Sequence, residues 1–525
     1  MGFGAHDWVA HHAAHQPDER ALGCAEDGRV LTWGQLEDRV GRLASVLADL
    51  GVGKGDRVAL VAENDPRVFE TQFAAMRLGA LFVPLNWRLT VHEMTDICLD
   101  AEPAVLVHDT TWAEAAEGIA EKAAVAHRLA WTGIAPDGAG TEAQVEARAG
   151  TGADDYEARL AAATPIGQPA GISLDDPTHI LYTSGTTGRP KGALSTGSTL
   201  VWQALNNAHT SGFAEPGCHQ LNHMPLFHAG GLHVMANPIL YFGGAVTTMT
   251  RFVPDLVLAH LAGSAPPVTH FAAIPLMYRA ISALLGFAAA DLSHARHFFI
   301  AGAIASPELH QLWADRGIPL QPQYGGTEMG PMATAMDQQG RWLEKSKAGS
   351  TGRRAFHTDI RLVDPDGRDV PDGQTGEIWL RGPSITVGYW RKNRDDFFTG
   401  DWFRTGDAAR RDPEGFYYLA GRTKEMYKSG GENVYPAEVE NVLSAHPDVA
   451  DVAVIGVPDP HWTEVGMAVV VPAEGAAPTL DSLHEFAAGA LARFKLPKHL
   501  VLVEELPRNV TGKVSRDALK QRYAQ

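Results

Sequence analysis

The segment YTSGTTGRPKG, at residues 182–192, constrains the fold of this chain more than any other stretch. It places four Ser or Thr hydroxyls, three glycines and the lysine Lys191 within eleven positions. Glycines allow sharp turns that bring backbone N–H groups close to an anion, hydroxyls add donors, and a lysine adds a compact charge for phosphate oxygens. The apolar residues 179–181 suit a strand that leads into this loop. The segment therefore predicts a triphosphate-binding loop after a strand, because the alternative, a polar surface loop, seldom combines these residue types so densely.

Apolar periodicity upstream of the loop predicts alternating helices and strands. Thr32 and Gln35 form a capping box at the start of a helix that Gly51 ends. Strands are expected at 57–62, 80–84 and 104–107, with a helix through 69–78. This alternation predicts a parallel sheet covered on both faces. Residues 133–170, rich in Gly, Ala and acids, are expected to form a variable surface excursion.

The end of the chain is expected to form a second domain, with the boundary near Lys424. Upstream of it, 376–381 and 415–419 are predicted short strands with glycine turns, typical of a small β element. Downstream, the pattern predicts helices at 436–443 and 480–491 and strands at 449–456 and 499–503. The fold class is therefore α/β. A large N-terminal domain of layered α/β subdomains with a small β element spans residues 1–423, and a small C-terminal α+β domain spans 424–525.

The loop is not a P-loop, G-x-x-x-x-G-K-[ST], because Pro190 precedes the lysine and neither Ser nor Thr follows it. It resembles instead the signature of the adenylate-forming superfamily of acyl-CoA synthetases, luciferases and peptide-synthetase adenylation domains. Six further stretches resemble motifs of that superfamily in the expected order: PLFHAGG at 225–231, QYGGTE at 323–328, WFRTGD at 402–407, GRTKE at 421–425, SGGENVYPAEVE at 429–440 and LPRNVTGKVSR at 506–516. Within them, GENVYPAEVE is similar to the coenzyme A ligase version of its motif.

The resemblance implies an enzyme in which a carboxylate attacks the α-phosphate of ATP and expels pyrophosphate, so the site must neutralise charge where two anions meet. The implied ATP-binding residues of the loop are Thr183, Ser184, Gly185, Thr186, Thr187 and Lys191. Magnesium needs a carboxylate together with phosphate oxygens. By the family pattern Glu328 is that ligand, with Thr183 and Thr327 near the metal or the α-phosphate. A surface acid after a turn is the alternative interpretation of Glu328.

The resemblance also implies how the nucleoside is bound. Asp407 would accept hydrogen bonds from the ribose hydroxyls, because a carboxylate can accept two from a cis-diol. Arg422 is expected at the ribose and phosphate, and Tyr324 is expected to stack on adenine, with ordinary core packing as its alternative. The remaining implied nucleotide contacts are Gly302, Ala303 and Gly325.

Lys513 is the implied catalytic residue. The family pattern sends this lysine into the active site, where it bridges the acyl carboxylate and the α-phosphate, although a lysine near a C-terminus is by itself usually a solvated surface charge. As a mobile point charge it stabilises the transition state only when the C-terminal domain has closed. His228 is the implied gate between carboxylate and acyl tunnel, with a hydrogen-bonded histidine beside a glycine turn as the alternative.

Lys424 stands at the position of the family's hinge. After adenylation the mobile C-terminal domain is expected to rotate about it and withdraw Lys513. The rotation would present the coenzyme A residues Ser429, Gly430 and Gly431, whose small side chains leave a slot for the pantetheine arm.

The acyl pocket is expected to have small residues in its walls. The residues assigned to it are Trp202, Asn206, His228, Ala301, Gly326 and Met329, beside Gly302, Ala303 and Gly325. The missing side-chain volume leaves room for an aromatic ring or for a medium to long chain, and the sequence leaves that choice open.

Composition excludes several classes of protein. The net charge of -18 argues against a nucleic-acid backbone as partner. Cys24, Cys98 and Cys218 lack metal or disulfide spacing, which suits a reducing cytosol. The N-terminus has no signal-peptide pattern, and no apolar run approaches the ~18 to 20 residues of a bilayer span. A cytoplasmic enzyme acting on a small-molecule carboxylic acid is therefore expected, with a homodimer among the oligomeric states that the sequence allows.

The predicted function is that of an acyl- or aryl-CoA ligase that uses ATP, Mg²⁺ and coenzyme A. The alternative is an adenylating enzyme whose acceptor is an amine, another small nucleophile, a carrier-protein thiol or oxygen. A third hypothesis is a catalytically silent nucleotide- or acyl-binding protein. That hypothesis predicts the loss of at least one of Lys191, Glu328, Asp407 and Lys513, and all four are present.

Overall fold

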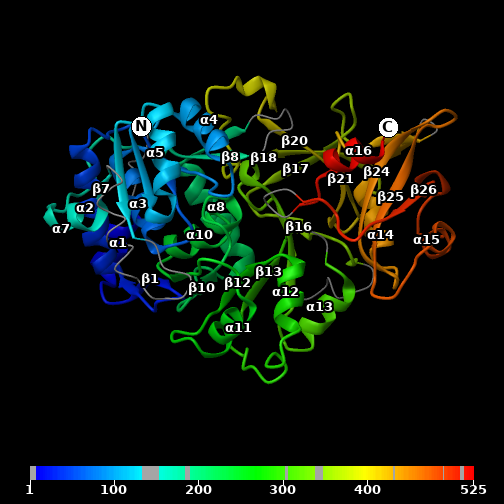
Figure 1. The fold of residues 1–525 in the computed structure, drawn as a ribbon, viewed down its shortest axis with the longest axis horizontal. Coiled ribbons are helices and arrows are strands. Elements are labelled where there is room, and N and C mark those ends of the chain that lie inside the picture. Colours follow the sequence, from blue (N-terminus) through cyan, green and yellow to red (C-terminus); the bar gives the residue numbers. More distant parts are fainter. Residues whose placement is uncertain are drawn as a thin grey trace.

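The computed structural model describes residues 7–132, 153–183, 190–301, 305–336, 347–429, 432–488, 490–508 and 513–524. Four β-sheets organise these residues. Colours in Figure 1 run from the blue and cyan elements of the N-terminal part, through the green second large sheet, to the orange C-terminal sheet on the right.

A seven-stranded sheet carries the predicted phosphate loop. Its strands, in the order β7-β6-β5-β3-β4-β8-β9, are β3 (Arg57–Val61), β4 (Leu81–Pro84), β5 (Val105–Asp109), β6 (His127–Trp131), β7 (Asp154–Asp155), β8 (Pro177–Thr183) and β9 (Lys191–Thr196). Neighbouring strands are parallel except β8 and β9, which form an antiparallel hairpin. Its helices are α2 (Trp33–Asp49), α3 (Pro66–Leu78), α4 (Val91–Ala101), α5 (Ala113–Lys122) and α7 (Tyr156–Ala162).

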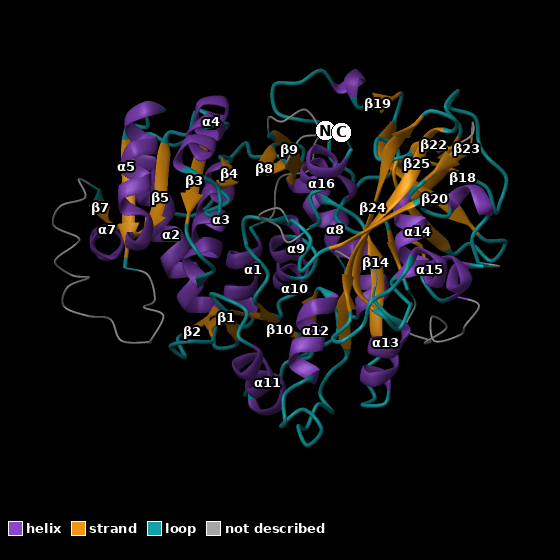
Figure 2. Cartoon of the chain, turned by 45° about the vertical axis from the view of Figure 1, so that its right-hand side comes forward, coloured by secondary structure: helices purple, strands orange, loops and turns teal. Residues whose placement is uncertain are grey.

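Helices cover both faces of this sheet, as the sequence predicts. Alternate residues of a strand point to opposite faces, and β3 divides its side chains accordingly. Val58 and Leu60 join one apolar core with α2 and α3, whereas Ala59 and Val61 join another with α4 and α5. Figure 2 shows α4 and α5 beside the strands β3 and β5. The predicted capping box is formed too, since Thr32 and Gln35 exchange both bonds at the start of α2.

A nine-stranded sheet forms the second layer, in the order β16-β15-β14-β13-β12-β10-β11-β1-β2. Its strands are β1 (Arg20–Cys24), β2 (Val30–Thr32), β10 (His219–Asn222), β11 (Ala245–Thr248), β12 (His270–Ala273), β13 (His297–Ile300), β14 (Leu320–Tyr324), β15 (Thr334–Ala335) and β16 (Arg353–Arg354). The helices of this region are α1 (Trp8–His15), α8 (Gly197–Ser211), α9 (Ala229–Leu232), α10 (Ala236–Tyr241), α11 (Pro254–Gly263), α12 (Pro275–Ser282) and α13 (Pro307–Ala314).

Two smaller sheets complete the described chain. The first comprises β17 (Asp359–Val363), β18 (Thr375–Arg381), β19 (Phe398–Thr399), β20 (Trp402–Arg411) and β21 (Tyr417–Arg422), all antiparallel. The second comprises β22 (Tyr427–Ser429), β23 (Glu432–Val434), β24 (Val449–Asp459), β25 (Thr463–Pro472) and β26 (His499–Leu502), with α14 (Pro436–Leu443), α15 (Leu480–Ala487) and α16 (Arg516–Tyr523). The small β element and the C-terminal α+β fold are therefore present.

One prediction about the fold is wrong for the residues that can be checked. Within the expected surface excursion at 133–170, residues 153–170 contain β7 and α7. Tyr156 on α7 is fully buried, and its hydroxyl donates a hydrogen bond of 2.7 Å to Glu70 on α3. Tyr156 and Leu160, one helical turn apart, anchor this segment, and two apolar positions are too few for a periodicity argument to detect. Residues 133–152 lie outside the described part.

Candidate active site

The β8–β9 hairpin places Thr183 and Lys191 directly opposite each other at its open end. The four predicted ATP-binding residues between them, at 184–187, lie outside the described residues. Gly192 has a steric role, because a Cβ there would lie 2.4 Å from Cγ2 of Ile180 in the partner strand. The hairpin therefore requires glycine just after the predicted phosphate lysine.

Glu328 receives hydrogen bonds from two other segments of the chain. It lies in the short 3₁₀ helix η3 (Thr327–Met329), which follows β14. Oγ1 of Thr183 donates to Oε1 of Glu328 at 3.0 Å, and the hydroxyl of Tyr389 donates to the same oxygen at 2.8 Å. A carboxylate beside hydroxyl oxygens fits Mg²⁺, which prefers oxygen ligands and takes the rest of its shell from phosphate and water. The predicted metal pair, Glu328 and Thr183, is thus in direct contact.

The predicted phosphate lysine lies against two aromatic rings. Nζ of Lys191 is 4.7 Å from the ring centre of Phe397 and 5.8 Å from that of Tyr389. Cation–π attraction holds an ammonium at such distances without neutralising its charge. Because the hydroxyl of Tyr389 also donates to Glu328, the same aromatic side chain contacts both the lysine and the carboxylate.

Asp407 is buried and uses both of its oxygens. It stands opposite Arg422 in the β20–β21 ladder, and Nε of Arg422 lies 2.7 Å from Oδ1. The hydroxyl of Tyr324 donates to Oδ2 at 2.6 Å. Burial raises the pKa of Asp407, and the Arg422 charge, the Tyr324 bond and the Lys513 charge act against that rise. Since a carboxylate offers about four lone-pair positions, Asp407 retains capacity for ribose hydroxyls.

Tyr324 itself packs in the apolar cluster that Ile378 and Leu380 help to form. Its stacking on adenine stays a prediction.

His228, the predicted gate to the acyl tunnel, caps a helix in the structure. It caps the N-terminus of α9, where its Nδ1 accepts a hydrogen bond of 3.0 Å from the backbone of Gly230. Its side chain is open to solvent, yet surrounding protein, and then the charges of Lys513 and Arg88, lower the pKa of His228 to about 4. His228 is therefore neutral at physiological pH.

Lys513 follows the C-terminal sheet and acts electrostatically on two predicted site residues. Its charge lowers the pKa values of both His228 and Asp407, which lie on different layers of the fold. Arg516 anchors the same segment, with Nη2 2.6 Å from Glu440 on α14 and Nη1 2.8 Å from Glu425. The structure therefore brings the predicted catalytic lysine to the residues predicted to bind ATP and the acid.

The predicted hinge lies between two sheets. Lys424 is exposed in the turn that joins β21 of one sheet to β22 of the next. Ser429 is buried at the end of β22, opposite Glu432. Gly430 and Gly431 lie outside the described residues, so the coenzyme A slot stays a prediction.

The predicted acyl-pocket residues come from several elements. On α8, Trp202 packs edge-on against His357 with ring centres 5.0 Å apart. The Asn206 amide is buried, donating to Oγ1 of Thr358 at 3.1 Å and accepting from the backbone of His357 at 2.9 Å. Asn206 thus holds the 355–358 segment against α8.

The other predicted pocket residues border Glu328 or end β13. Met329 is buried, whereas Ala301, just after β13, and Gly326 are half-buried. A Cβ at Gly325 would lie 1.8 Å from the carbonyl oxygen of Pro331, so only glycine fits there. Gly302 and Ala303 lie outside the described residues.

Sequence reasoning missed Tyr389. It contacts both Glu328 and Lys191, and a bridge pairs it with Ala193 of β9. The local sequence Gly388-Tyr389-Trp390 carries no chemical signature. Its role depends on a contact between positions far apart in the chain, which no local pattern encodes.

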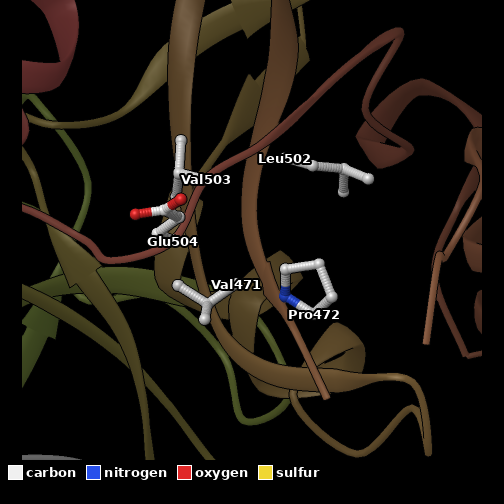
Figure 3. Close-up of a pocket in the computed structure, with 5 residues that line it drawn as sticks. All are labelled: Val471, Pro472, Leu502, Val503 and Glu504. Carbon is white, nitrogen blue, oxygen red and sulfur yellow. The ribbon is translucent and has the colours of Figure 1, made fainter. Parts of the chain in front are cut away.

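A separate hollow of about 480 Å³ lies on the C-terminal sheet (Figure 3). It is lined by Val471, Pro472, Leu502, Val503 and Glu504. None of these residues is among those assigned to the candidate active site, such as Glu328 and Lys513. The hollow is therefore not part of the candidate active site.

Two features are absent from the described residues. No helix among them is long and apolar enough to cross a membrane. No group of three or more His, Cys, Asp or Glu side chains in that part of the chain is arranged to hold a metal ion.

Comparison with known proteins gives matches along the whole chain. A family model described as AMP-binding enzyme matches residues 9–390, and one described as AMP-binding enzyme C-terminal domain matches residues 438–513. Feruloyl-CoA synthase from Amycolatopsis sp is 38% identical over 525 residues, covering 100% of this chain and 99% of the relative. Indoleacetate–CoA ligase from Aromatoleum aromaticum is 37% identical over 523 residues, covering 99% and 98%.

Solved structures match equally widely. ATP-bound MatB from Rhodopseudomonas palustris superposes with a TM-score of 0.85 at 30% identity, covering 99% of each chain. The amide bond synthetase McbA from Marinactinospora thermotolerans has a TM-score of 0.85 at 26% identity, covering 98% of this chain and 99% of the other.

Proposed function

Since the chain belongs to the AMP-binding enzyme family and is an AMP-forming acyl-CoA ligase, we propose that its substrate is an aryl-substituted carboxylic acid. The enzyme activates an acid with ATP and transfers the acyl group to coenzyme A, using Mg²⁺. The aryl proposal is supported by the names of the two curated relatives, feruloyl-CoA synthase and indoleacetate–CoA ligase. The small side chains of the half-buried Ala301 and Gly326, both assigned to the acyl pocket, are compatible with a ring.

The hydrogen bond from Thr183 to Glu328, together with the influence of Glu328 and Lys513 on the pKa of Asp407, carries the assignment of the site. Bound Mg²⁺, held by Glu328, would neutralise charge on the phosphate oxygens.

In the first half-reaction a carboxylate oxygen of the acid bonds to the α-phosphorus of ATP, and the bond from that phosphorus to pyrophosphate breaks. Lys513 places its ammonium between the two reacting anions, where negative charge concentrates. Lys191 binds the departing phosphates, and Asp407 with Arg422 holds the ribose. A neutral His228 borders the acid without adding charge of its own.

In the second half-reaction the thiol of coenzyme A loses its proton, its sulfur bonds to the acyl carbon, and AMP leaves. We place the domain boundary at residues 423/424, since the turn holding Lys424 joins two sheets. Rotation there would withdraw Lys513 and present the segment that begins at Ser429.

The proposal is tested by measuring AMP release with a panel of aryl acids and straight-chain fatty acids, with and without coenzyme A. Aryl acids are expected to release AMP at least about tenfold faster than fatty acids at equal concentration. Repeated turnover is expected only when coenzyme A is present. A preference for fatty acids would overturn the substrate class. Equal AMP release without coenzyme A, or with an amine in its place, would favour the non-CoA acceptor, the chemistry that the name of McbA describes.

A further inference from the structure

Two buried histidines lie in contact beside the site and have no role in the reaction described above. His179 is in β8, the strand that ends at Thr183, and His233 directly follows α9, whose N-terminal cap is His228. Their ring centres are 5.1 Å apart with the ring planes at 75°. Their exposed fractions are 0% and 2%, so solvent satisfies neither ring.

The neighbours of His233 fix the position of its proton. Nδ2 of Asn237 lies 3.1 Å from Nδ1 of His233. An amide nitrogen only donates, so Nδ1 accepts and the proton of the neutral ring is on Nε2. The amide of Asn237 is itself oriented by Gln72, since the two exchange hydrogen bonds of 2.9 and 3.3 Å.

The neighbours of His179 fix the opposite tautomer. Nδ1 of His179 lies 3.0 Å from Oγ1 of Thr178. That hydroxyl donates its own proton to the carbonyl of Ser195 at 3.3 Å, so it accepts from His179. The proton of His179 is therefore on Nδ1, and its Nε2 is a bare acceptor.

One ring thus offers an N–H at Nε2 and the other a lone pair at Nε2. Both atoms are buried, and neither has a hydrogen-bond partner among the described residues. Leaving such a donor and such an acceptor unpaired is costly, which favours their pairing.

We propose that one buried water accepts from Nε2–H of His233 and donates to Nε2 of His179, and that this link fixes the segment bearing His228 against the strand bearing Thr183. The two histidines are positioning residues. They connect the side of the cleft that borders the acid to the side that holds the ATP phosphates. The functional consequence rests on the role proposed above for His228, whereas the link itself does not.

The link needs both rings neutral, because a second proton on His179 would remove the lone pair to which the water donates. Burial, followed by the nearby His233 ring, lowers the pKa of His179 well below its ordinary value. Burial, followed by His228, lowers the pKa of His233 to about 3. Both rings are therefore neutral across the pH range of ordinary assays.

The first test is nitrogen NMR of the wild-type protein labelled with ¹⁵N-histidine, with His179→Phe and His233→Phe assigning the signals. The expected result is opposite tautomers, a proton on Nδ1 of His179 and on Nε2 of His233. Loss of the His233 ring in His233→Phe should also shift the Nε2 signal of His179. The same tautomer in both rings, or an unmoved His179 signal, would overturn the proposal. Neither outcome depends on activity, so a failure of this proposal can be told apart from a failure of the proposed function.

The second test is a double-mutant cycle on adenylation, followed by pyrophosphate exchange. Each Phe variant is expected to lower kcat between about tenfold and a hundredfold, the effect of a misplaced reacting group. The double variant should lose no more than either single one, because the link is already broken. His233→Gln, which restores an amide donor, should recover most of the loss, and His310→Phe on α13 should lose nothing. Additive losses, or no rescue by glutamine, would contradict a positioning role.

Discussion

Thr183 and Glu328 are 145 residues apart in the chain, and the hydroxyl of the first donates a hydrogen bond of 3.0 Å to the carboxylate of the second. This contact joins the end of the phosphate hairpin to the short helix after β14. Because Tyr389 donates to the same carboxylate oxygen, one acidic group is fixed from two sides. A carboxylate held in this way meets a metal ion without reorganising, which favours catalysis by pre-orientation.

Replacement of Glu328 tests its assignment as the metal ligand. Glu328→Gln keeps the size of the side chain and an oxygen for the Thr183 bond but removes the negative charge. We expect adenylation to fall by at least about a hundredfold, the size of effect seen when one preorganised electrostatic group is removed. The concentration of Mg²⁺ that gives half-maximal pyrophosphate exchange should rise as well.

The matched control for that change is Tyr389→Phe, which removes one hydrogen bond to Glu328 and keeps the ring under Lys191. A loss of about tenfold, without a comparable shift in Mg²⁺ dependence, is expected for the loss of one hydrogen bond. If both variants behaved alike, Glu328 would act as a structural acid and not as a ligand.

Lys513 should serve only one of the two half-reactions. Lys513→Ala removes the ammonium that influences both His228 and Asp407. Adenylation should fall between about a hundredfold and a thousandfold, while thioester formation from presynthesised acyl adenylate should stay within about twofold of wild type, since the lysine is withdrawn by then. Equal losses in both half-reactions would refute the domain rotation.

Arg516 should hold the lysine segment in place. It contacts Glu440, whose pKa burial raises, and Glu425 in the turn next to Lys424. Arg516→Gln leaves a largely buried carboxylate without its partner, which costs about 3 kcal/mol or more of unfolding free energy. Urea unfolding should show this loss together with slower adenylation. Arg522→Gln, an exposed substitution on the same helix, should show neither.

Local patterns predicted the parts of the fold that local chemistry determines. The helix after Thr32 begins with its capping box, and the predicted helix at Pro436–Leu443 has the predicted bounds. The helix predicted at 480–491 is longer than the observed α15, which ends at Ala487. Gly489 is a helix-stop signal in the sequence, and the apolar residues that continue to Leu491 obscured it.

The residues of the site fall into the same two groups, those that a local motif reveals and those that only a distant contact reveals. Glu328, Asp407 and Lys513 were recognisable because each stands in a motif with a chemical purpose. Tyr389, and the His179–His233 pair, were not, because their significance arises from contacts between distant strands and helices. The amide of Asn206 illustrates the difference, since its motif-based assignment gave no sign that the backbone of His357 and Thr358 would engage it.

A buried histidine should make the protein sensitive to acid. His219 is 1% exposed, and burial, followed by the charge of Arg20, lowers its pKa from 6.5 to about 4. Between these values the unfolded chain binds a proton that the folded chain does not, so stability is complete above pH 6.5 and falls as the pH approaches 4. The expected contribution is about 1.4 kcal/mol per pH unit.

Urea titrations at pH 7, 6 and 5 measure that dependence. His219→Gln keeps a donor for the Pro266 carbonyl and does not titrate. Its unfolding free energy should therefore decline less steeply with acid than that of the wild type, by about the slope given above. Parallel slopes for the two proteins would mean that His219 is charged in the folded state.

The adjacent glycines Gly325 and Gly326 are expected to have different roles: the backbone requires the first, and the second lines the acyl pocket. Gly326 has an extended backbone, with φ of -165°, and a Cβ there would meet only the Met329 side chain at 3.5 Å, so Gly326→Val should fold. If Gly326 borders the acid, the added methyl groups should raise KM for an aryl acid by about tenfold, the discrimination available to a small apolar change, and leave KM for ATP unchanged.

Gly325→Ala is the contrast, because its Cβ would lie 1.8 Å from a backbone oxygen. This variant should lower the unfolding temperature and the activity on every acid together. A Gly326→Val enzyme that binds ATP more weakly but the acid normally would move Gly326 from the acyl pocket to the nucleotide site.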